Sequence, residues 1–83
     1  MKKVAKTIDL IIGRVESLLP FDNVSDAREL LNAGEWGEAL SIIVTQIYEY
    51  DKTISQSTMH LIESAHKLIG IESQILKKIS VAD

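Results

Sequence analysis

Histidines are the first residues to consider for metal or acid–base chemistry, and the chain has two of them, His60 and His66. On a helix, a spacing of six residues turns the second side chain about 120° away from the first. The i, i+4 spacing that lets two histidines share a metal ion is missing. We therefore predict two surface histidines flanking a core stripe, and no metal site.

Carboxylates are more abundant, with 12 Asp and Glu residues in a chain of 83. Acid–base catalysis needs two of them held close together in a cleft, and a chain of this length has little interior in which to build one. Gly34 and Gly37 show neither the spacing of a dinucleotide-binding loop nor that of a P-loop, and no strand precedes them. We therefore expect a protein that is not an enzyme and uses no cofactor.

Hydrophobic residues at three- and four-residue intervals predict helices along most of the chain. The first helix spans roughly residues 3–19 and stops at Pro20, because proline cannot continue a helix. Its expected core residues are Val4, Ile8, Ile11, Ile12, Val15, Leu18 and Leu19.

The second and third predicted helices are separated by a glycine. The second lies within residues 21–34 and ends at Gly34. Its N-cap candidates are Asp22, Asn23 and Ser25. The third begins at Glu35 or Trp36 and runs to about Tyr50. Its expected core residues are Trp36, Leu40, Ile43, Val44, Ile47 and Tyr50.

Two further helices are expected in the last third of the chain. Ser55 or Ser57 caps a fourth helix, which ends at Gly70. Its expected core residues are Leu61, Ile62, Ala65, Leu68 and Ile69. The hydrophobic spacing over residues 71–79 predicts a fifth helix, and no run alternates with period two for long enough to predict a strand.

These elements predict an all-α fold, a small bundle of four to five short helices that forms a single domain over residues 1–83. No apolar stretch approaches the roughly 20 residues that cross a bilayer, and acidic residues interrupt any signal-peptide-like start. The chain has no Cys, as is common in reducing compartments. We expect a cytoplasmic protein without a membrane partner.

The negative charge is concentrated in the middle of the chain. The net charge is −3, yet residues 20–51 contain seven acidic residues and a single basic one, Arg28. A helix-turn-helix could be built around Gly34, but residues 29–51 hold five acidic groups and no basic one. Such a recognition helix would repel phosphate, which opposes direct nucleic-acid binding.

The outward side of the third helix is a narrow acidic strip. Opposite the core stripe lie Glu38, Ile42, Thr45 and Glu49, with Ser41 and Tyr48 along one edge. One interpretation is a solvated helix face with a stray aliphatic residue. The other is a docking strip for a basic protein surface, because solvated faces usually mix both charges.

One segment also resembles a known family. Residues 27–72 contain GEWGEAL at 34–40, IYEYD at 47–51 and an Ile-Ser loop at 54–55. This combination resembles the signature of the MafI-like immunity proteins of bacterial polymorphic toxin systems, of the contact-dependent inhibition type. The match covers rather more than half of the chain.

The resemblance implies a protein that binds and neutralises the toxic C-terminal domain of a cognate secreted or contact-delivered toxin. Many such toxins are nucleases, including ones that cut tRNA or other RNA, and a nuclease active site is basic, so that an acidic helix complements it. The expected partner-binding residues are Glu38, Ile42, Thr45, Tyr48, Glu49 and Asp51. The patch could extend to Asp22, Asp26 and Glu29.

Two other interpretations remain open at this point. The chain could be a small helical adaptor or regulatory module without a toxin partner, or a small DNA-binding regulator. A homodimer is a further option, because Leu10, Met59 and the isoleucines of residues 71–79 offer apolar surface.

Overall fold

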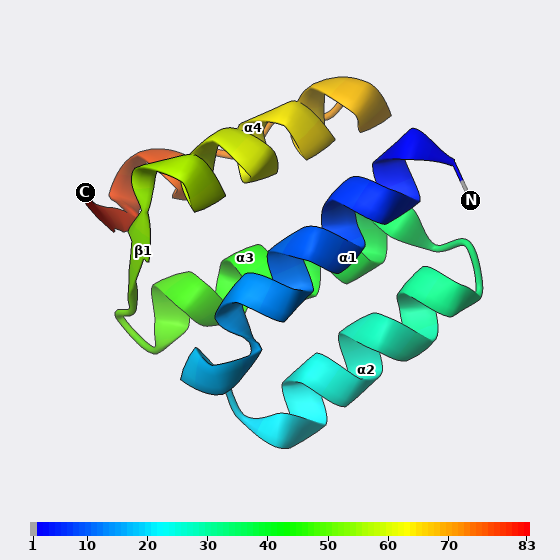
Figure 1. Ribbon diagram of the computed structural model, residues 1–83, viewed down its shortest axis with the longest axis horizontal. Helices are drawn as coiled ribbons and strands as arrows, with labels where there is room; N and C mark the ends of the chain where they lie inside the picture. Colours follow the sequence, from blue (N-terminus) through cyan, green and yellow to red (C-terminus); the bar gives the residue numbers. More distant parts are fainter. Residues whose placement is uncertain (1) are drawn as a thin grey trace.

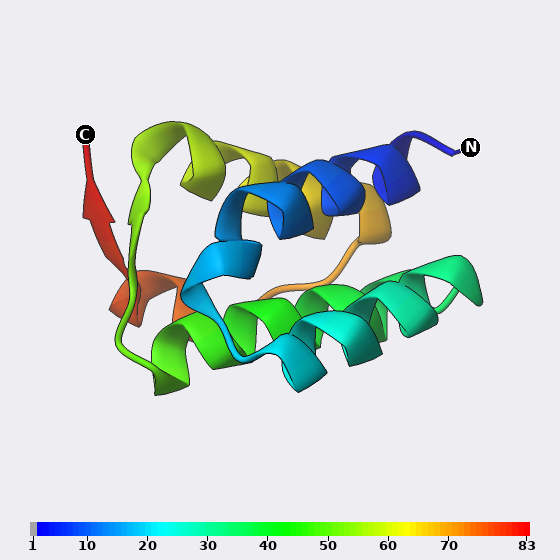
Figure 2. The ribbon, with the colours of Figure 1, turned by 60° about the horizontal axis from the view of Figure 1, so that its bottom comes forward.

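The computed structural model describes residues 2–83, and its helices form two packed layers. The four α-helices of this range are α1 (Lys3–Val15), α2 (Phe21–Asn32), α3 (Trp36–Glu49) and α4 (Gln56–Ile69). Helices α2 and α3 lie side by side in one layer and make the most extensive contact, while α1 packs against α4 in the other (Figures 1 and 2). The predicted all-α bundle is confirmed.

The core lies between these layers and takes side chains from every helix. Its largest fully buried side chains are Ile8, Ile11, Ile12, Val15, Leu40, Ile43, Ile47 and Ile62. Because these residues recur at helical spacing in the sequence, the core-facing sides of α1 and α3 follow directly from the hydrophobic pattern. None of the described helices has the length and hydrophobicity needed to span a membrane.

The first helix is shorter than predicted. It ends at Val15, and a 3₁₀ turn, η1 (Glu16–Leu18), leads to Pro20. The residue before a proline is forced out of the helical region, and Leu19 accordingly adopts φ −119° and ψ 158°. The tightened turn rotates Leu18 out of the core, so its predicted burial is wrong.

The ends of α2 and α3 are set by local backbone rules. Pro20 is the N-cap of α2, so Asp22, Asn23 and Ser25 lie inside the helix and the predicted N-caps are wrong. Gly34 adopts φ +81° after the helix, which confirms the predicted glycine stop. Helix α3 has the predicted bounds, but Tyr50 lies beyond its last residue and is 51% exposed, so its predicted burial is wrong.

Helix α4 is capped at both ends as predicted. The Ser55 hydroxyl accepts a hydrogen bond from the Thr58 N–H at 3.1 Å, and Gly70 adopts φ +83°. The buried side of α4 is shifted toward its start. Met59 is buried and Leu68 is exposed, so Leu68 is not the core residue that we predicted and Met59 offers no surface for a dimer.

The predicted fifth α-helix is absent from the described chain. Residues after Gly70 run extended, form a 3₁₀ turn, η2 (Ile75–Lys78), and end in strand β2 (Ser80–Ala82). This strand pairs in parallel with β1 (Thr53–Ser55), matching Ile54 with Val81, so the expectation of no strand is also wrong.

The distance that the chain must cover after α4 explains why this segment is not an α-helix. Helix α4 has 14 residues, so the chain must return about 21 Å to lie beside β1. As a helix, residues 71–79 would span only about 13 Å, whereas an extended chain of that length reaches about 30 Å. On the way, Ile75 and Leu76 pack against the core and Ile79 is buried.

Candidate protein-binding surface

The two histidines occupy different environments. His60 is exposed, as predicted, but His66 is buried and its Nδ1 lies 2.9 Å from the Ile62 carbonyl oxygen. Because a carbonyl can only accept, Nδ1 carries the proton in this contact. His66 is therefore a satisfied core histidine, which corrects the prediction of two surface histidines. Over residues 2–83, no three His, Cys, Asp or Glu side chains are grouped to hold a metal ion.

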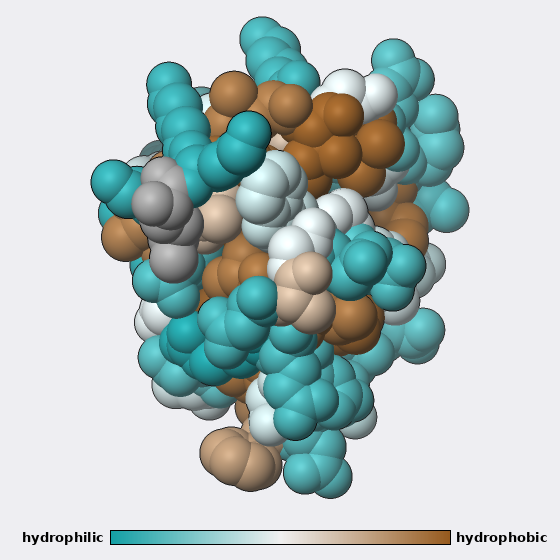
Figure 3. All heavy atoms as spheres, turned by 90° about the vertical axis from the view of Figure 1, so that its right-hand side faces the viewer, coloured by the Kyte–Doolittle hydropathy of each residue, from teal (hydrophilic) through white to brown (hydrophobic). Residues whose placement is uncertain are grey.

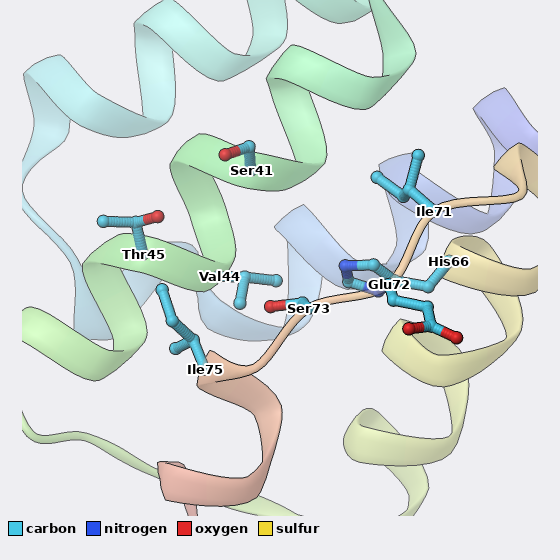
Figure 4. Close-up of a pocket in the computed structure, with 8 residues that line it drawn as sticks. All are labelled: Ser41, Val44, Thr45, His66, Ile71, Glu72, Ser73 and Ile75. Atoms are coloured by element: carbon cyan, nitrogen blue, oxygen red, sulfur yellow. The ribbon is translucent and has the colours of Figure 1, made fainter.

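A small cavity lies beside His66, between α3, α4 and the returning C-terminal segment. Its volume is about 120 Å³. Figure 4 shows the segment that carries Ile71, Glu72 and Ser73 passing between the two helices, with Ile75 reaching toward α3. Ligand pockets are usually about 300 Å³ or larger, so this cavity is better described as a packing gap than as a substrate site.

The charged residues of α2 and α3 are all carboxylates, apart from Arg28. We call Asp22, Asp26, Glu29, Glu38 and Glu49 the acidic surface, and all five are exposed. Arg28 is the one basic residue on these two helices. Its Nη1 lies 3.0 Å from Asp9 and its Nη2 lies 3.4 Å from Glu16, so its guanidinium is directed toward α1 and η1.

The six predicted partner-binding residues differ in accessibility. Glu38, Tyr48, Glu49 and Asp51 are exposed. Ile42 is half-buried and packs against the core cluster, and Thr45 is half-buried because it lines the cavity covered by Ile75. Ile42 and Thr45 therefore offer less exposed side-chain area to a partner than the other four predicted residues.

Asp51 has a structural role in addition to its exposed carboxylate. It adopts φ +52°, the only positive φ of a non-glycine residue within the described range. The Asp51 N–H donates to the Tyr48 carbonyl at 3.0 Å, and the Lys52 N–H donates to the Ile47 carbonyl at 3.0 Å. These contacts satisfy the last carbonyls of α3 and turn the chain toward β1.

Three exposed aromatic side chains extend the candidate surface at one end of the layer. Phe21 is 81% exposed, Tyr50 51% and Tyr48 42%. Because α2 and α3 run antiparallel, α2 begins at the end of the molecule where α3 finishes (Figures 1 and 2). Aromatic residues are enriched in protein interfaces, so this end is suited to binding a protein.

Phe21 was not among the residues predicted from the sequence. A signal was present, because Pro20 ends the first predicted helix and Phe21 directly follows it, at the start of the next helix. At the start of a helix a side chain has no preceding turn to pack against. Tyr50 was missed because the hydrophobic spacing of α3 continues one residue beyond the helix.

The opposite end of the molecule carries a smaller apolar patch. Figure 3 faces the end at which α4 finishes, and hydrophobic side chains gather in its upper part, over α4. Leu68, in the last turn of α4, and Ile71, which follows the helix, are both exposed. Hydrophilic side chains cover most of the lower part of the same view.

Comparison with known proteins does not assign this surface, because no family model, curated protein or solved structure matches the chain.

Proposed function

We propose that this protein is an immunity protein, which binds and neutralises the toxic C-terminal domain of a secreted or contact-delivered bacterial toxin. The observation that carries the proposal is the acidic surface, where five exposed carboxylates lie on two adjacent helices whose one basic residue is directed toward α1. The sequence resemblance in residues 27–72 supports the same function.

The partner that best fits this surface is a basic nuclease domain, such as an RNase that cuts tRNA. A nuclease must attract phosphates, so its active site is positively charged, and an acidic partner surface steers association with it and competes with the nucleic acid. Glu38, Tyr48, Glu49 and Asp51 form the centre of the proposed contact, which Ile42 and Thr45 border.

A protein contact of ordinary size would occupy only part of this molecule's surface. The molecule exposes 5085 Å², and a standard interface takes about 800 Å² from each partner, roughly a sixth of that area. We expect the outer face of α2 and α3 and the neighbouring turns to contribute most of this contact.

The proposed function predicts that a toxin domain is encoded beside this gene, and co-expression with that domain tests the function directly. We expect the protein to rescue cells from that domain and to retain it in a pull-down. The Glu38→Lys, Glu49→Lys double variant should associate about tenfold or more slowly while keeping its helical circular dichroism spectrum.

A matched control distinguishes the effect of changing the acidic surface from the effect of changing the net charge of the protein. The Glu63→Lys, Glu72→Lys double variant makes the same change in net charge at exposed positions of α4 and the C-terminal segment. We expect it to bind like the wild type. If both variants lose the same amount of binding, the acidic surface has no specific part in the mechanism. Absence of both rescue and binding would favour a helical adaptor that uses the same surface for another protein.

A further inference from the structure

A groove lies beside the acidic surface, between η1 and the outer side of α2. Its volume is about 330 Å³. The residues that line it are Glu16, Leu19, Phe21, Val24, Ser25, Arg28, Glu29 and Asn32. Leu19 and Val24 are buried and form an apolar floor, whereas Phe21 is 81% exposed and stands at the edge.

Some charged residues that line the groove are paired with an opposite charge, and one is not. Arg28 is already paired with Asp9 and Glu16. Glu29 is exposed, and no basic side chain of the described residues forms an ion pair with it. Asp22 and Asp26 lie on the same helix and add further negative charge. The groove therefore combines an apolar floor and an exposed aromatic ring with a carboxylate that lacks a counter-charge.

We propose that this groove binds an arginine or lysine side chain of the partner protein. The aliphatic stem would lie on Leu19 and Val24, the cation would lie against the Phe21 ring, and Glu29 would accept its hydrogen bonds. A purely apolar side chain fits less well, because it would remove water from Glu29 and offer no hydrogen bond in return. This proposal rests on the proposed function in one respect: it assumes that the partner protein is the toxin domain.

The recognition chemistry can be tested without the toxin. ¹⁵N-labelled protein is titrated with millimolar N-acetyl-arginine amide and, separately, with the neutral analogue N-acetyl-citrulline amide. We expect the arginine compound to shift the amide resonances of residues 19 and 21–29, and the citrulline compound to leave them in place. Equal shifts from both compounds, or arginine shifts spread over all acidic residues, would overturn the proposal.

Variants make this test specific. Phe21→Ala and Glu29→Gln should each abolish the arginine response. Their matched controls are Leu10→Ala, which removes an exposed apolar side chain from α1, and Glu63→Gln, which neutralises an exposed carboxylate on α4. Both controls should keep the response. If the groove resonances instead shift with protein concentration alone, a second copy of the chain occupies the groove and the proposal is wrong.

Toxin binding then separates this proposal from the proposed function. Phe21→Ala and Glu29→Gln should weaken binding of the adjacent toxin domain about tenfold, and the two controls should not. If both groove variants bind the toxin domain as tightly as the wild type does, the groove proposal is wrong and the proposed function is unaffected. If the arginine compound shifts the groove resonances but the protein does not bind the toxin domain, the proposed function is wrong and the groove proposal is supported.

Discussion

At the scale of single residues, Arg28 determines the charge of the candidate surface. Its contacts with Asp9 and Glu16 are partly exposed, so they contribute little to stability, about 0–1 kcal/mol. Their larger effect is electrostatic, because they hold the one cation of α2 and α3 against the neighbouring layer. The acidic surface is thus a consequence of where Arg28 points as well as of the number of carboxylates.

Asp51 combines a structural role with a place in the proposed contact. Its φ of +52° is unfavourable for a residue with a Cβ atom, so Asp51→Gly should raise the free energy of unfolding by about 0.5–1 kcal/mol. Urea denaturation measures this change. The control Asp51→Ala keeps the backbone penalty and should bring no gain. Stabilisation by alanine to the same degree would show that the carboxylate, and not the backbone, is responsible.

At the scale of elements, the C-terminal segment is the part that holds distant pieces of the chain together. It crosses between α3 and α4, and β2 pairs with β1, which directly precedes α4. A two-stranded sheet is only marginally stable by itself. The packing of Ile75, Leu76 and Ile79 against the helices must therefore hold the segment in place.

Ile79 anchors this segment, since it is the buried residue next to β2. Ile79→Ala should lower the free energy of unfolding by about 2 kcal/mol, the low end for an isoleucine because the site lies at the edge of the core. Val81→Ala, at an exposed position of β2, is the matched control and should change it by less than about 0.5 kcal/mol. Similar losses from both variants in urea denaturation would mean that the strand pairing is the anchor.

Local signals explain which elements could be predicted from the sequence. Gly34, Ser55 and Gly70 mark helix ends through their own backbone preferences, so those bounds are correct. The C-terminal segment could not be predicted, because its path depends on the length of α4 and on the unpaired edge of β1. Both are long-range features, and the hydrophobic spacing of residues 71–79 fits a helix equally well.

The candidate surface was predictable to a similar extent. Helical spacing alone places Glu38 and Glu49 on the outside of α3, and the structure agrees. It could not show that Ile42 and Thr45 are half-covered, because the covering residues come from other parts of the chain. The groove could not be predicted from the sequence either, because it forms only where η1 interrupts the helix predicted for residues 3–19.

At the scale of the whole molecule, charge is divided between the layers. Residues 20–51, which contain α2 and α3, carry a net charge of −6, whereas the chain as a whole carries −3, so the remaining residues carry +3. Such a division orients an approaching basic protein toward one face before contact. It also keeps two copies from associating through their acidic surfaces, because like charges would meet.

This division of charge predicts how salt would affect binding of the proposed toxin partner. Raising NaCl from about 0.05 to 0.5 M shortens the Debye length from about 14 to 4 Å, so the association rate constant should fall about tenfold or more. The dissociation rate constant should change much less, because short-range contacts set it. Stopped-flow kinetics at several salt concentrations measures both rates.

The Glu38→Lys, Glu49→Lys variant provides the decisive comparison, because it changes the charge of the acidic surface from five carboxylates to three carboxylates and two ammonium groups. Its association rate should be slower at low salt, with a flatter salt dependence, and should approach the wild-type rate at high salt. Parallel salt dependences for the two proteins would mean that steering arises elsewhere on the molecule. Convergence at high salt would show that the carboxylates act at a distance, before the interface forms.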